Sequence, residues 1–187
     1  MSLNAILSAK KDEVLAAWFD RILDTYPAET AKFLKNQKDK FANPVGQAIH
    51  AGIEDIFREL LNGGEIEKIS GFLDNIIRVR AIQEFSASQA VAFIFFLKSA
   101  IRDHIKDTPL TPELSEELVT LESQIDSLAL IAFDIFMQCR EKLYEIKANE
   151  MKNMTYRLLQ RANMVTEIED SEKQTNFIAI KKKEVNT

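Results

Sequence analysis

A short segment near the middle of the chain carries the residues best suited to bind a small ligand. It lies between two apolar stretches and contains Arg78, Arg80, Gln83 and Glu84. Guanidinium and amide groups at this spacing could converge on a small anion or on backbone carbonyl oxygens. The simpler interpretation is that the arginines lie at a helix end, where the helix dipole favours cations, and pair with Asp74 or Glu84. We favour the simpler interpretation and keep Arg78, Arg80 and Gln83 as ligand candidates.

Aromatic residues indicate a second candidate, an apolar pocket. A phenylalanine-rich stretch that includes Phe93 could approach Trp18, Phe19, Phe57 and Phe72 if the helices pack together. Aromatic residues at helical spacing more often form ordinary core. A cavity beside them would instead indicate a ligand site. On this basis Trp18 and Phe93 join the ligand candidates.

The two histidines and the single cysteine give little support for metal, haem or covalent chemistry. His50 and His104 are isolated, and the residues three positions before them are Gln47 and Ile101, so the Glu-x-x-His pair of a di-iron bundle is absent. Cys139 lies on an apolar helix face and is interpreted as a core residue. No nucleophile–base pair appears by spacing. We expect no cofactor and no enzymatic activity, and we keep a haem- or metal-binding globin-like protein as an alternative.

Composition indicates one soluble domain with an appendage. The 187 residues carry a net charge of −5 and include one cysteine, which argues against a nucleic-acid partner and against a disulfide framework. The longest apolar run, residues 90–97, is far below the ~20 residues needed to cross a bilayer. We expect a cytoplasmic protein. Lys181–Lys183 supply too little attraction for stable attachment to a membrane surface, although an accessory subunit of a membrane-associated complex stays an alternative.

Helical periodicity extends through the chain and predicts an all-α fold of about six helices. Apolar residues recur at spacings of three and four, and the helix-capping residues Asn43, Ser86 and Thr111 each precede such a segment. The expected helices cover residues 4–24, 27–34, 44–62, 66–80, 90–105 and 112–165. We expect Val91–Leu97, apolar on all sides, to be the central buried element. No strand is predicted.

The last predicted helix is the clearest feature of the pattern. Pro112 is the last glycine or proline in the chain, and 75 residues follow it. A helix from Pro112 to Val165 would be roughly 80 Å long, whereas a domain of this size has a radius of gyration of about 16 Å, so we expect the helix to project from the core. Its far end carries an apolar stripe that we predict to form a homodimer interface: Met151, Met154, Leu158 and Val165. Residues 166–187 are expected to be a polar, disordered tail.

Several contiguous segments resemble a known family of sensor domains. They are Ala17-Trp18-Phe19 with Tyr26-Pro27, the run Phe41-Ala42-Asn43-Pro44-Val45-Gly46, the run from Ile77 to Ala90, and Phe133-Asp134-Ile135-Phe136 with Cys139-Arg140-Glu141-Lys142. Together they are similar to the RsbRD-type N-terminal sensor domain over residues 10–162. The most specific part is the contiguous pattern Arg-x-Arg-Ala-x-Gln-x-Phe-Ser-x-Ser-Gln-Ala, which contains Arg80 and Gln83.

This resemblance implies an α-helical, globin-like sensor domain that usually binds no haem. In bacterial relatives it precedes a phosphorylatable STAS domain, in RsbR-type co-antagonists of the stressosome that hold the RsbT kinase. Only 22 residues follow Val165, too few for a STAS domain and its phospho-acceptor threonines, so we do not expect the kinase-holding function. We expect residues 1–165 to be a stand-alone, non-enzymatic sensor or regulatory module that acts through a homodimer, a protein partner carrying the output, and a small ligand.

Overall fold

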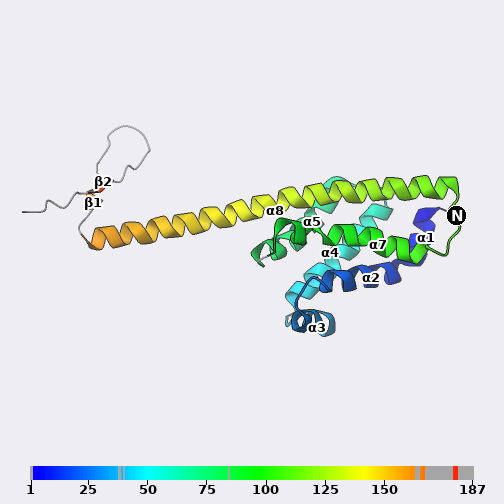
Figure 1. Ribbon diagram of the computed structural model, residues 1–187, viewed down its shortest axis with the longest axis horizontal. Helices are drawn as coiled ribbons and strands as arrows, with labels where there is room; N and C mark the ends of the chain where they lie inside the picture. The colour runs from blue at the N-terminus through cyan, green and yellow to red at the C-terminus, as the bar shows by residue number, and fades with distance from the viewer. Residues whose placement is uncertain are drawn as a thin grey trace, which may run out of the picture. The chain divides into compact units, whose positions relative to one another are not determined.

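The computed structural model of the chain is almost entirely helical (Figure 1). It describes residues 2–37, 39, 41–83, 85–162, 165–166 and 179–180. The chain divides into two compact units, Met1–Arg140 and Glu141–Thr187. The first unit contains the hydrophobic core and all the candidate ligand residues.

Eight helices and two very short strands make up the described part of the chain. The helices are α1 (Leu3–Ala9), α2 (Lys11–Leu23), α3 (Ala28–Asn36), α4 (Pro44–Leu61), α5 (Ile66–Ile82), α6 (Ala87–Val91), α7 (Phe93–Ile105) and α8 (Pro112–Arg161). The strands β1 (Val165–Thr166) and β2 (Ala179–Ile180) pair antiparallel, with Val165 opposite Ile180. The prediction of an all-α fold with a long C-terminal helix is confirmed, and the two-residue strands do not change that class.

Two of the predicted helices are each divided in two. The predicted helix 4–24 is α1 followed by α2, because Lys10 leaves the helical conformation (φ −108°, ψ 17°). Its Nζ instead donates a hydrogen bond to a backbone carbonyl near the end of α7. The predicted helix 90–105 is α6 followed by α7. Here Ala92 keeps helical dihedral angles, and the Phe95 N–H bonds to the Ala92 carbonyl three residues earlier, which is a tightened turn.

The predicted capping residues all cap helices. Asn43 Oδ1 accepts a hydrogen bond from Gly46 N at 2.8 Å, and Pro44 follows in the first turn of α4. Ser86 and Gln89 form a reciprocal capping box at the start of α6. The Thr111 hydroxyl accepts from the first turn of α8 at 3.3 Å. These short-range signals are local in sequence, and the structure preserves each one.

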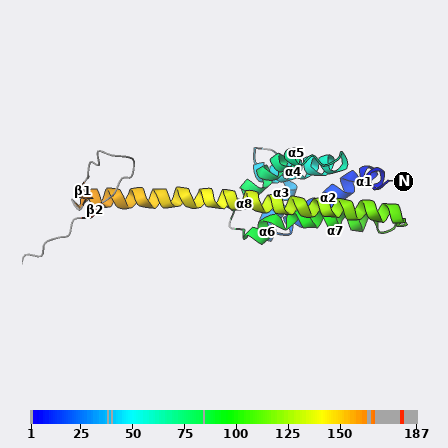
Figure 2. The same ribbon diagram turned by 90° about the horizontal axis from the view of Figure 1, so that it is seen from above.

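The core of the first unit lies between two helix pairs. Helix α2 packs along α7, α4 packs along α5, and α2 also contacts α4 (Figure 2). Within the predicted central segment Val91–Leu97, the side chains of Phe93, Ile94 and Leu97 are buried. Phe95, however, is 44% exposed. The expectation that this segment is buried on all sides is therefore wrong, because one face of α7 reaches the surface.

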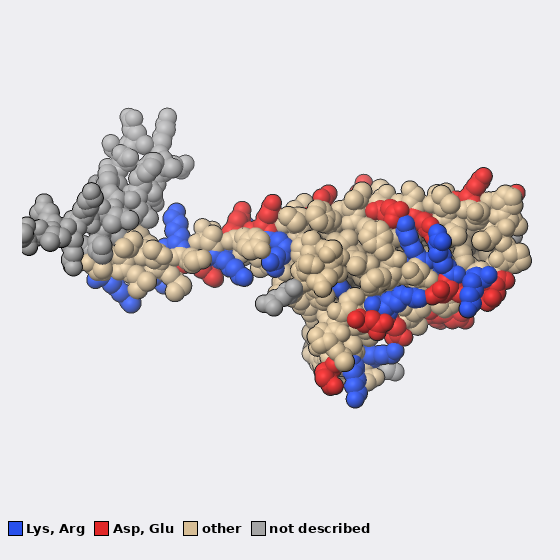
Figure 3. Space-filling view, viewed as in Figure 1, with Lys and Arg blue, Asp and Glu red and all other residues tan. Residues whose placement is uncertain are grey.

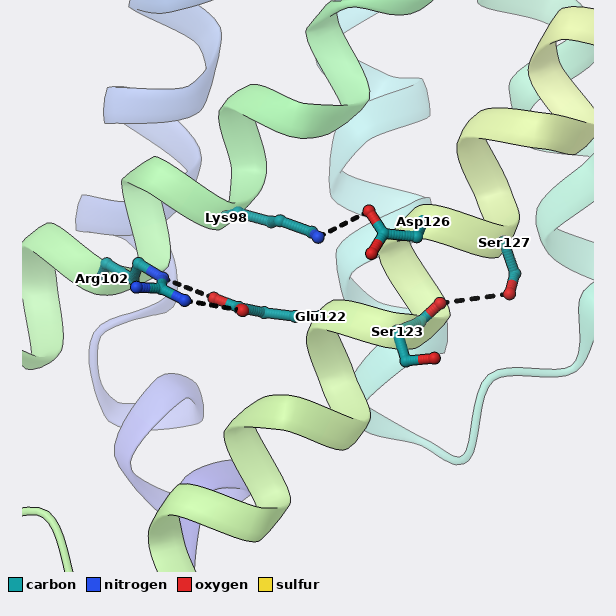
Figure 4. A network of polar contacts seen from close by, with 6 residues as sticks. All are labelled: Lys98, Arg102, Glu122, Ser123, Asp126 and Ser127. Carbon is teal, nitrogen blue, oxygen red and sulfur yellow. Dashed lines mark hydrogen bonds and ion pairs between the residues drawn. The ribbon is translucent and has the colours of Figure 1, made fainter.

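The first part of α8 packs against α7 and is held there by two ion pairs (Figure 4). Lys98 Nζ lies 2.5 Å from Asp126 Oδ1, and Arg102 makes two bonds to the Glu122 carboxylate at 2.5 and 2.7 Å. The inward face of α8 carries its buried residues: Leu114, Leu118, Leu121, Ile125, Leu128, Ala129, Ala132, Ile135 and Phe136. Apolar packing and the two ion pairs together hold this part of α8 against the core.

The long helix ends earlier than the sequence predicts. It stops at Arg161, and Val165 lies in β1 instead of continuing the helix. Absence of glycine and proline permits a helix, but beyond Arg140 nearly all described side chains are exposed, so little packing supports further turns. The predicted disordered tail, residues 166–187, lies outside the described residues except at Thr166 and in β2.

The surface of the first unit carries both signs of charge. Lysine and arginine side chains alternate with aspartate and glutamate over the face of residues 1–140 shown in Figure 3. On that face no basic patch of the kind that binds nucleic acid stands out. Among the described residues, no helix combines the length and apolar character needed to cross a membrane.

Candidate functional site

Arg80, in the last turn of α5, is a charged side chain with no solvent exposure. Its Nη2 donates hydrogen bonds to Thr25 Oγ1 at 3.0 Å and to the Gln89 carbonyl at 3.2 Å. Its Nε and Nη1 atoms are buried and have no hydrogen-bond partner among the described residues. No aspartate or glutamate of the described residues interacts with it. Burying an ion without an opposite charge costs several kcal/mol.

Three aromatic rings surround this guanidinium. Its Cζ lies 4.3 Å from the ring centroid of Phe85, 5.4 Å from that of Tyr26 and 5.6 Å from that of Phe93. Tyr26 and Phe85 also contact each other edge to face, with centroids 5.3 Å apart. The electronegative faces of aromatic rings attract cations, by about 2 kcal/mol at a desolvated site. The rings therefore offset part of the cost of burying Arg80, while two of its nitrogen atoms stay unpaired.

The remaining ligand candidates, apart from Arg78, lie beside this cluster. Trp18 stacks on Phe93 with centroids 6.4 Å apart, and its Nε1–H donates to the Phe93 carbonyl at 2.6 Å. Gln83 Oε1 accepts a hydrogen bond from the Tyr26 hydroxyl at 3.0 Å. Trp18 of α2, Arg80 of α5, Gln83 directly after α5 and Phe93 of α7 are thus brought together, as a shared ligand site would require.

The local electrostatics follow from burial. Desolvation lowers the pKa of the Arg80 guanidinium below its ordinary value, although the nearby Tyr26 raises it. Burial likewise raises the pKa of the Tyr26 hydroxyl, against a smaller opposing effect of Arg80. An arginine stays protonated throughout the physiological range, and a tyrosine of raised pKa stays neutral there. The cluster therefore holds one positive charge and a neutral phenol.

Arg78 does not belong to the cluster. Its exposed side chain pairs with Asp74 one turn earlier, with Nε and Oδ2 2.5 Å apart, and this bond raises the pKa of Arg78. The simpler interpretation of the arginines is therefore correct for Arg78 and wrong for Arg80, which points inward and has no carboxylate partner. Glu84, the other proposed partner, lies outside the described residues.

A surface groove of about 550 Å³ lies apart from this cluster. It is lined by Ser2, Leu3, Asn4, Leu60, Gly63, Glu113, Glu116, Glu117, Thr120, Leu121 and Gln124. Three glutamates from the start of α8 make it acidic, and Glu117 accepts a hydrogen bond from the Leu3 N–H at 2.5 Å. None of the predicted ligand residues lines this groove.

The histidines and the cysteine have separate surroundings. His50 is exposed and contacts the Phe19 ring edge to face. His104 Nδ1 lies 2.7 Å from the Ala100 carbonyl, one turn earlier in α7. Cys139 is half-buried against the core, and desolvation raises the pKa of its thiol. Within the described chain, no three histidine, cysteine or acidic side chains are grouped as metal ligands.

Comparison with known protein families identifies the domain. The family model of the RsbT co-antagonist protein rsbRD N-terminal domain matches residues 12–151. The chain belongs to this family. Membership of the rsbRD N-terminal family indicates a sensor or regulatory signalling domain and confirms the resemblance seen in the sequence. It is a family of regulatory domains, not one known for enzymes.

More distant comparisons add little to this assignment. This rsbRD N-terminal domain is 23% identical over 145 residues to an uncharacterized protein of Archaeoglobus fulgidus, a match that covers 75% of this chain and 83% of the relative. No solved structure matches. The globin-like character implied by the family resemblance therefore stays a prediction.

Four residues of the Arg80 cluster were not predicted as site residues. They are Thr25, Tyr26, Phe85 and Gln89. In the sequence Tyr26 and Gln89 appear only within the segments that resemble the family, with no role of their own. Their common role depends on contact between the α2–α3 turn and the α5–α6 connection. Residues so far apart in the sequence carry no periodic signal of such a contact.

Proposed function

We propose that this rsbRD N-terminal domain is a non-enzymatic sensor module that forms a homodimer along α8 and acts on a protein partner. The observation that carries the proposal is the set of large apolar side chains exposed on α8. Met151, Met154 and Leu158 are 68%, 64% and 63% exposed. Soluble proteins rarely leave several such side chains together without a binding role.

These residues belong to a longer repeat than the sequence pattern alone indicated. The large exposed apolar residues of the repeat are spaced by three, four or seven positions along α8: Leu130, Phe133, Met137, Tyr144, Met151, Met154 and Leu158. Such spacing keeps side chains on one face of a helix. It is not the face that is buried against the core, which includes Leu128, Ala132 and Ile135.

A second copy of α8 would cover this face, because the exposed apolar side chains of the two helices would pack against each other. Each buried apolar side chain contributes roughly 1.5–3 kcal/mol as an upper estimate. Lys147 falls in the same repeat, between Tyr144 and Met151, and a charged seam residue weakens such an interface. A moderately stable two-fold contact suits a regulatory module, because a change in the first unit can alter how the paired helices pack. The fourth predicted interface residue, Val165, lies in β1, outside this repeat.

The dimer is tested by changing Met154 and Leu158 to aspartate together. The unmodified chain should scatter light as twice its 21.3 kDa mass, whereas M154D/L158D should be a monomer that keeps the helical circular dichroism spectrum of the unmodified chain. The matched control is N153D/Q160D, which adds two charges on the other side of the same turns. That variant should stay dimeric. A monomeric unmodified protein at micromolar concentration would exclude the proposed homodimer.

The output partner is tested separately. Family membership supports action on another protein, and the exposed face of α8 is the surface through which a dimer would present its state. Cross-linking in cells from a photoreactive residue at an exposed α8 position, such as Lys152, should yield the homodimer and one larger discrete adduct. Recovery of the homodimer alone, at every exposed α8 position tried, would count against a protein partner on this helix.

A further inference from the structure

Arg80 differs from the arginines of the first unit that form ion pairs. Arg21, Arg58, Arg78 and Arg102 are at least partly exposed, and each pairs with a carboxylate. Arg80 is fully buried, yet no described carboxylate lies against it. Proteins ordinarily bury an arginine only with a partner. Arg80 therefore lacks a counter-ion among the described residues.

The atoms free to hold a counter-ion are known. Nη2 donates to Thr25 and Gln89, so the N–H groups of Nε and Nη1 are the donors that have no acceptor in the described part of the chain. The aromatic rings contact the guanidinium through their π systems and do not supply acceptors in the plane where the N–H groups point. An anionic oxygen is the acceptor that such donors bind most strongly.

The charge of the cluster selects the charge of the ligand. The contacts of Arg80 are with Thr25, Tyr26, Phe85, Phe93 and a backbone carbonyl, all of them uncharged. One monovalent anion would neutralise the site. A dianion such as hydrogen phosphate would leave an unpaired negative charge among aromatic rings, which is unfavourable.

Of the three rings around Arg80, Phe85 is the one whose movement would give a ligand access to the guanidinium. Tyr26 and Phe93 are buried, whereas Phe85 is only half-buried and lies in the short connection between α5 and α6. It is also the ring closest to the guanidinium. Rotation of Phe85 would open the way from solvent to Arg80, and the apolar part of a ligand could then take the place of the ring against Tyr26.

We propose that Arg80 is the receptor for the carboxylate of a small organic acid whose apolar body displaces Phe85. This inference rests on the proposed sensor function and deepens it by naming the class of ligand. The acid would replace the missing counter-ion of Arg80 and fix the α5–α6 connection in a second position. The acidic groove near the start of α8 has no comparable unpaired donor.

The fluorescence of the single tryptophan can report the binding of a carboxylate at Arg80. Trp18 is the single tryptophan, and it stacks on Phe93, which also contacts Arg80. Sodium propionate and sodium benzoate should therefore change the Trp18 emission of the full chain in a saturable manner. Sodium chloride at the same ionic strength should not do so, and sodium phosphate should have at most a weak, non-saturating effect.

Two arginine-to-methionine substitutions distinguish carboxylate binding at Arg80 from a general effect of losing an arginine. Arg80→Met should abolish the response, while Arg78→Met, two residues away and exposed, should leave it unchanged. Arg80→Lys keeps the charge without the planar fork and should weaken binding by about tenfold or more. It serves in place of Arg80→Met if circular dichroism shows that the methionine variant is unfolded. Phe85→Ala should strengthen binding, because no ring has to be displaced.

Several outcomes would overturn the proposal. They are a flat titration of the unmodified chain with both acids, an unchanged response in Arg80→Met, or an equal response to chloride. Weaker binding by Phe85→Ala would overturn the role of Phe85. The dimer is measured independently by light scattering. A dimer without a carboxylate response therefore refutes only this inference, and a carboxylate response in a monomer refutes only the proposed dimer.

Discussion

At the scale of single residues, the side chain that deserves most explanation is Arg80, because it stabilises the fold less than its burial suggests. It gains cation–π contacts with three rings and two hydrogen bonds. It loses the hydration of a full charge, and two of its donors gain nothing in return. A methionine, which is unbranched like arginine, would pack among Tyr26, Phe85 and Phe93 without that loss.

We predict that Arg80→Met leaves the free energy of unfolding unchanged or raises it by about 1 kcal/mol or more. The reason is that no buried carboxylate of the described chain is left unpaired when the guanidinium is removed. Urea denaturation followed by circular dichroism measures the change. Arg78→Met is the control and should cost only about 0.5 kcal/mol, since it removes an exposed pair with Asp74. A loss above about 3 kcal/mol for Arg80→Met would instead assign Arg80 a structural role.

At the scale of elements, a single buried asparagine joins α3 to α4. Asn43 is 1% exposed, and its Oδ1 caps α4 by accepting from Gly46 N. Its Nδ2 donates to the carbonyls of Leu34 and Gln37, both at 2.9 Å. A Cβ on Gly46 would lie 2.4 Å from this amide, so glycine is required there by space. One amide group therefore satisfies both the end of α3 and the start of α4.

We predict that Asn43→Ala destabilises the protein by about 2–3 kcal/mol, because it removes the cap and leaves buried carbonyls without donors. The informative comparison is Asn43→Asp. Aspartate is as good an N-cap as asparagine, but it cannot donate to Leu34 and Gln37. It should therefore still cost about 1–2 kcal/mol. Thermal and urea unfolding measure both variants, and a neutral Asn43→Asp would mean that capping alone is the role of this residue.

The Arg102–Glu122 ion pair between α7 and α8 gives the stability of the protein a defined dependence on pH. The hydrogen bond from Arg102 holds the pKa of Glu122 below its ordinary value, against a smaller opposing effect of desolvation. Because the pKa is lower in the folded state, the pair contributes its stability at pH values above the unfolded pKa, about 4.3. That contribution is lost as the pH falls through the folded pKa.

We predict that Glu122→Gln lowers the free energy of unfolding by about 0.5–1 kcal/mol at neutral pH, since Arg102 is largely exposed and solvent screens the pair. The difference from the unmodified protein should shrink as the pH is lowered from about 5 toward 3. Denaturation curves at a series of pH values measure it. Glu116→Gln, an exposed carboxylate without an ion pair to the described residues, should show no such trend. A difference that grows toward low pH would contradict the assigned sign.

Sequence patterns predict the helices better than they predict the contacts between helices. Caps at Asn43, Ser86 and Thr111 involve neighbours within a few residues, and periodicity reports a helix face directly, so both were predicted. The break at Lys10 was missed because its side chain bonds to the distant end of α7. Arg80 was interpreted as a capping cation because its burial is decided by the turn at Thr25 and Tyr26, more than fifty residues earlier. Local patterns predict elements, whereas the site arises from contacts between them.

At the scale of the whole molecule, α8 takes part in two different kinds of packing. Up to Phe136 its residues include those buried in the core of the first unit. Arg140, the last residue of that unit, donates from Nη1 to the Ala81 carbonyl at 3.2 Å, near the end of α5. Beyond it the helix presents large apolar side chains to solvent. The same helix thus contacts the element that carries Arg80 and supplies the proposed dimer face, so the proposed ligand and the proposed dimer would both act on α8.

A chain that ends at Arg140 tests this division. It keeps every described buried residue of α8, so its free energy of unfolding should lie within about 1 kcal/mol of that of the full-length M154D/L158D monomer. It lacks Tyr144, Met151, Met154 and Leu158, so it should be monomeric at concentrations where the full chain is a dimer. A chain ending at Arg161 is the matched control and should behave as the full chain does. Light scattering and urea denaturation measure both properties.

If the shorter chain stays dimeric, the contact lies within the first unit, and Leu130, Phe133 and Met137 become the residues to change. If it fails to fold, residues 141–161 support the core, and the division at Arg140 is wrong.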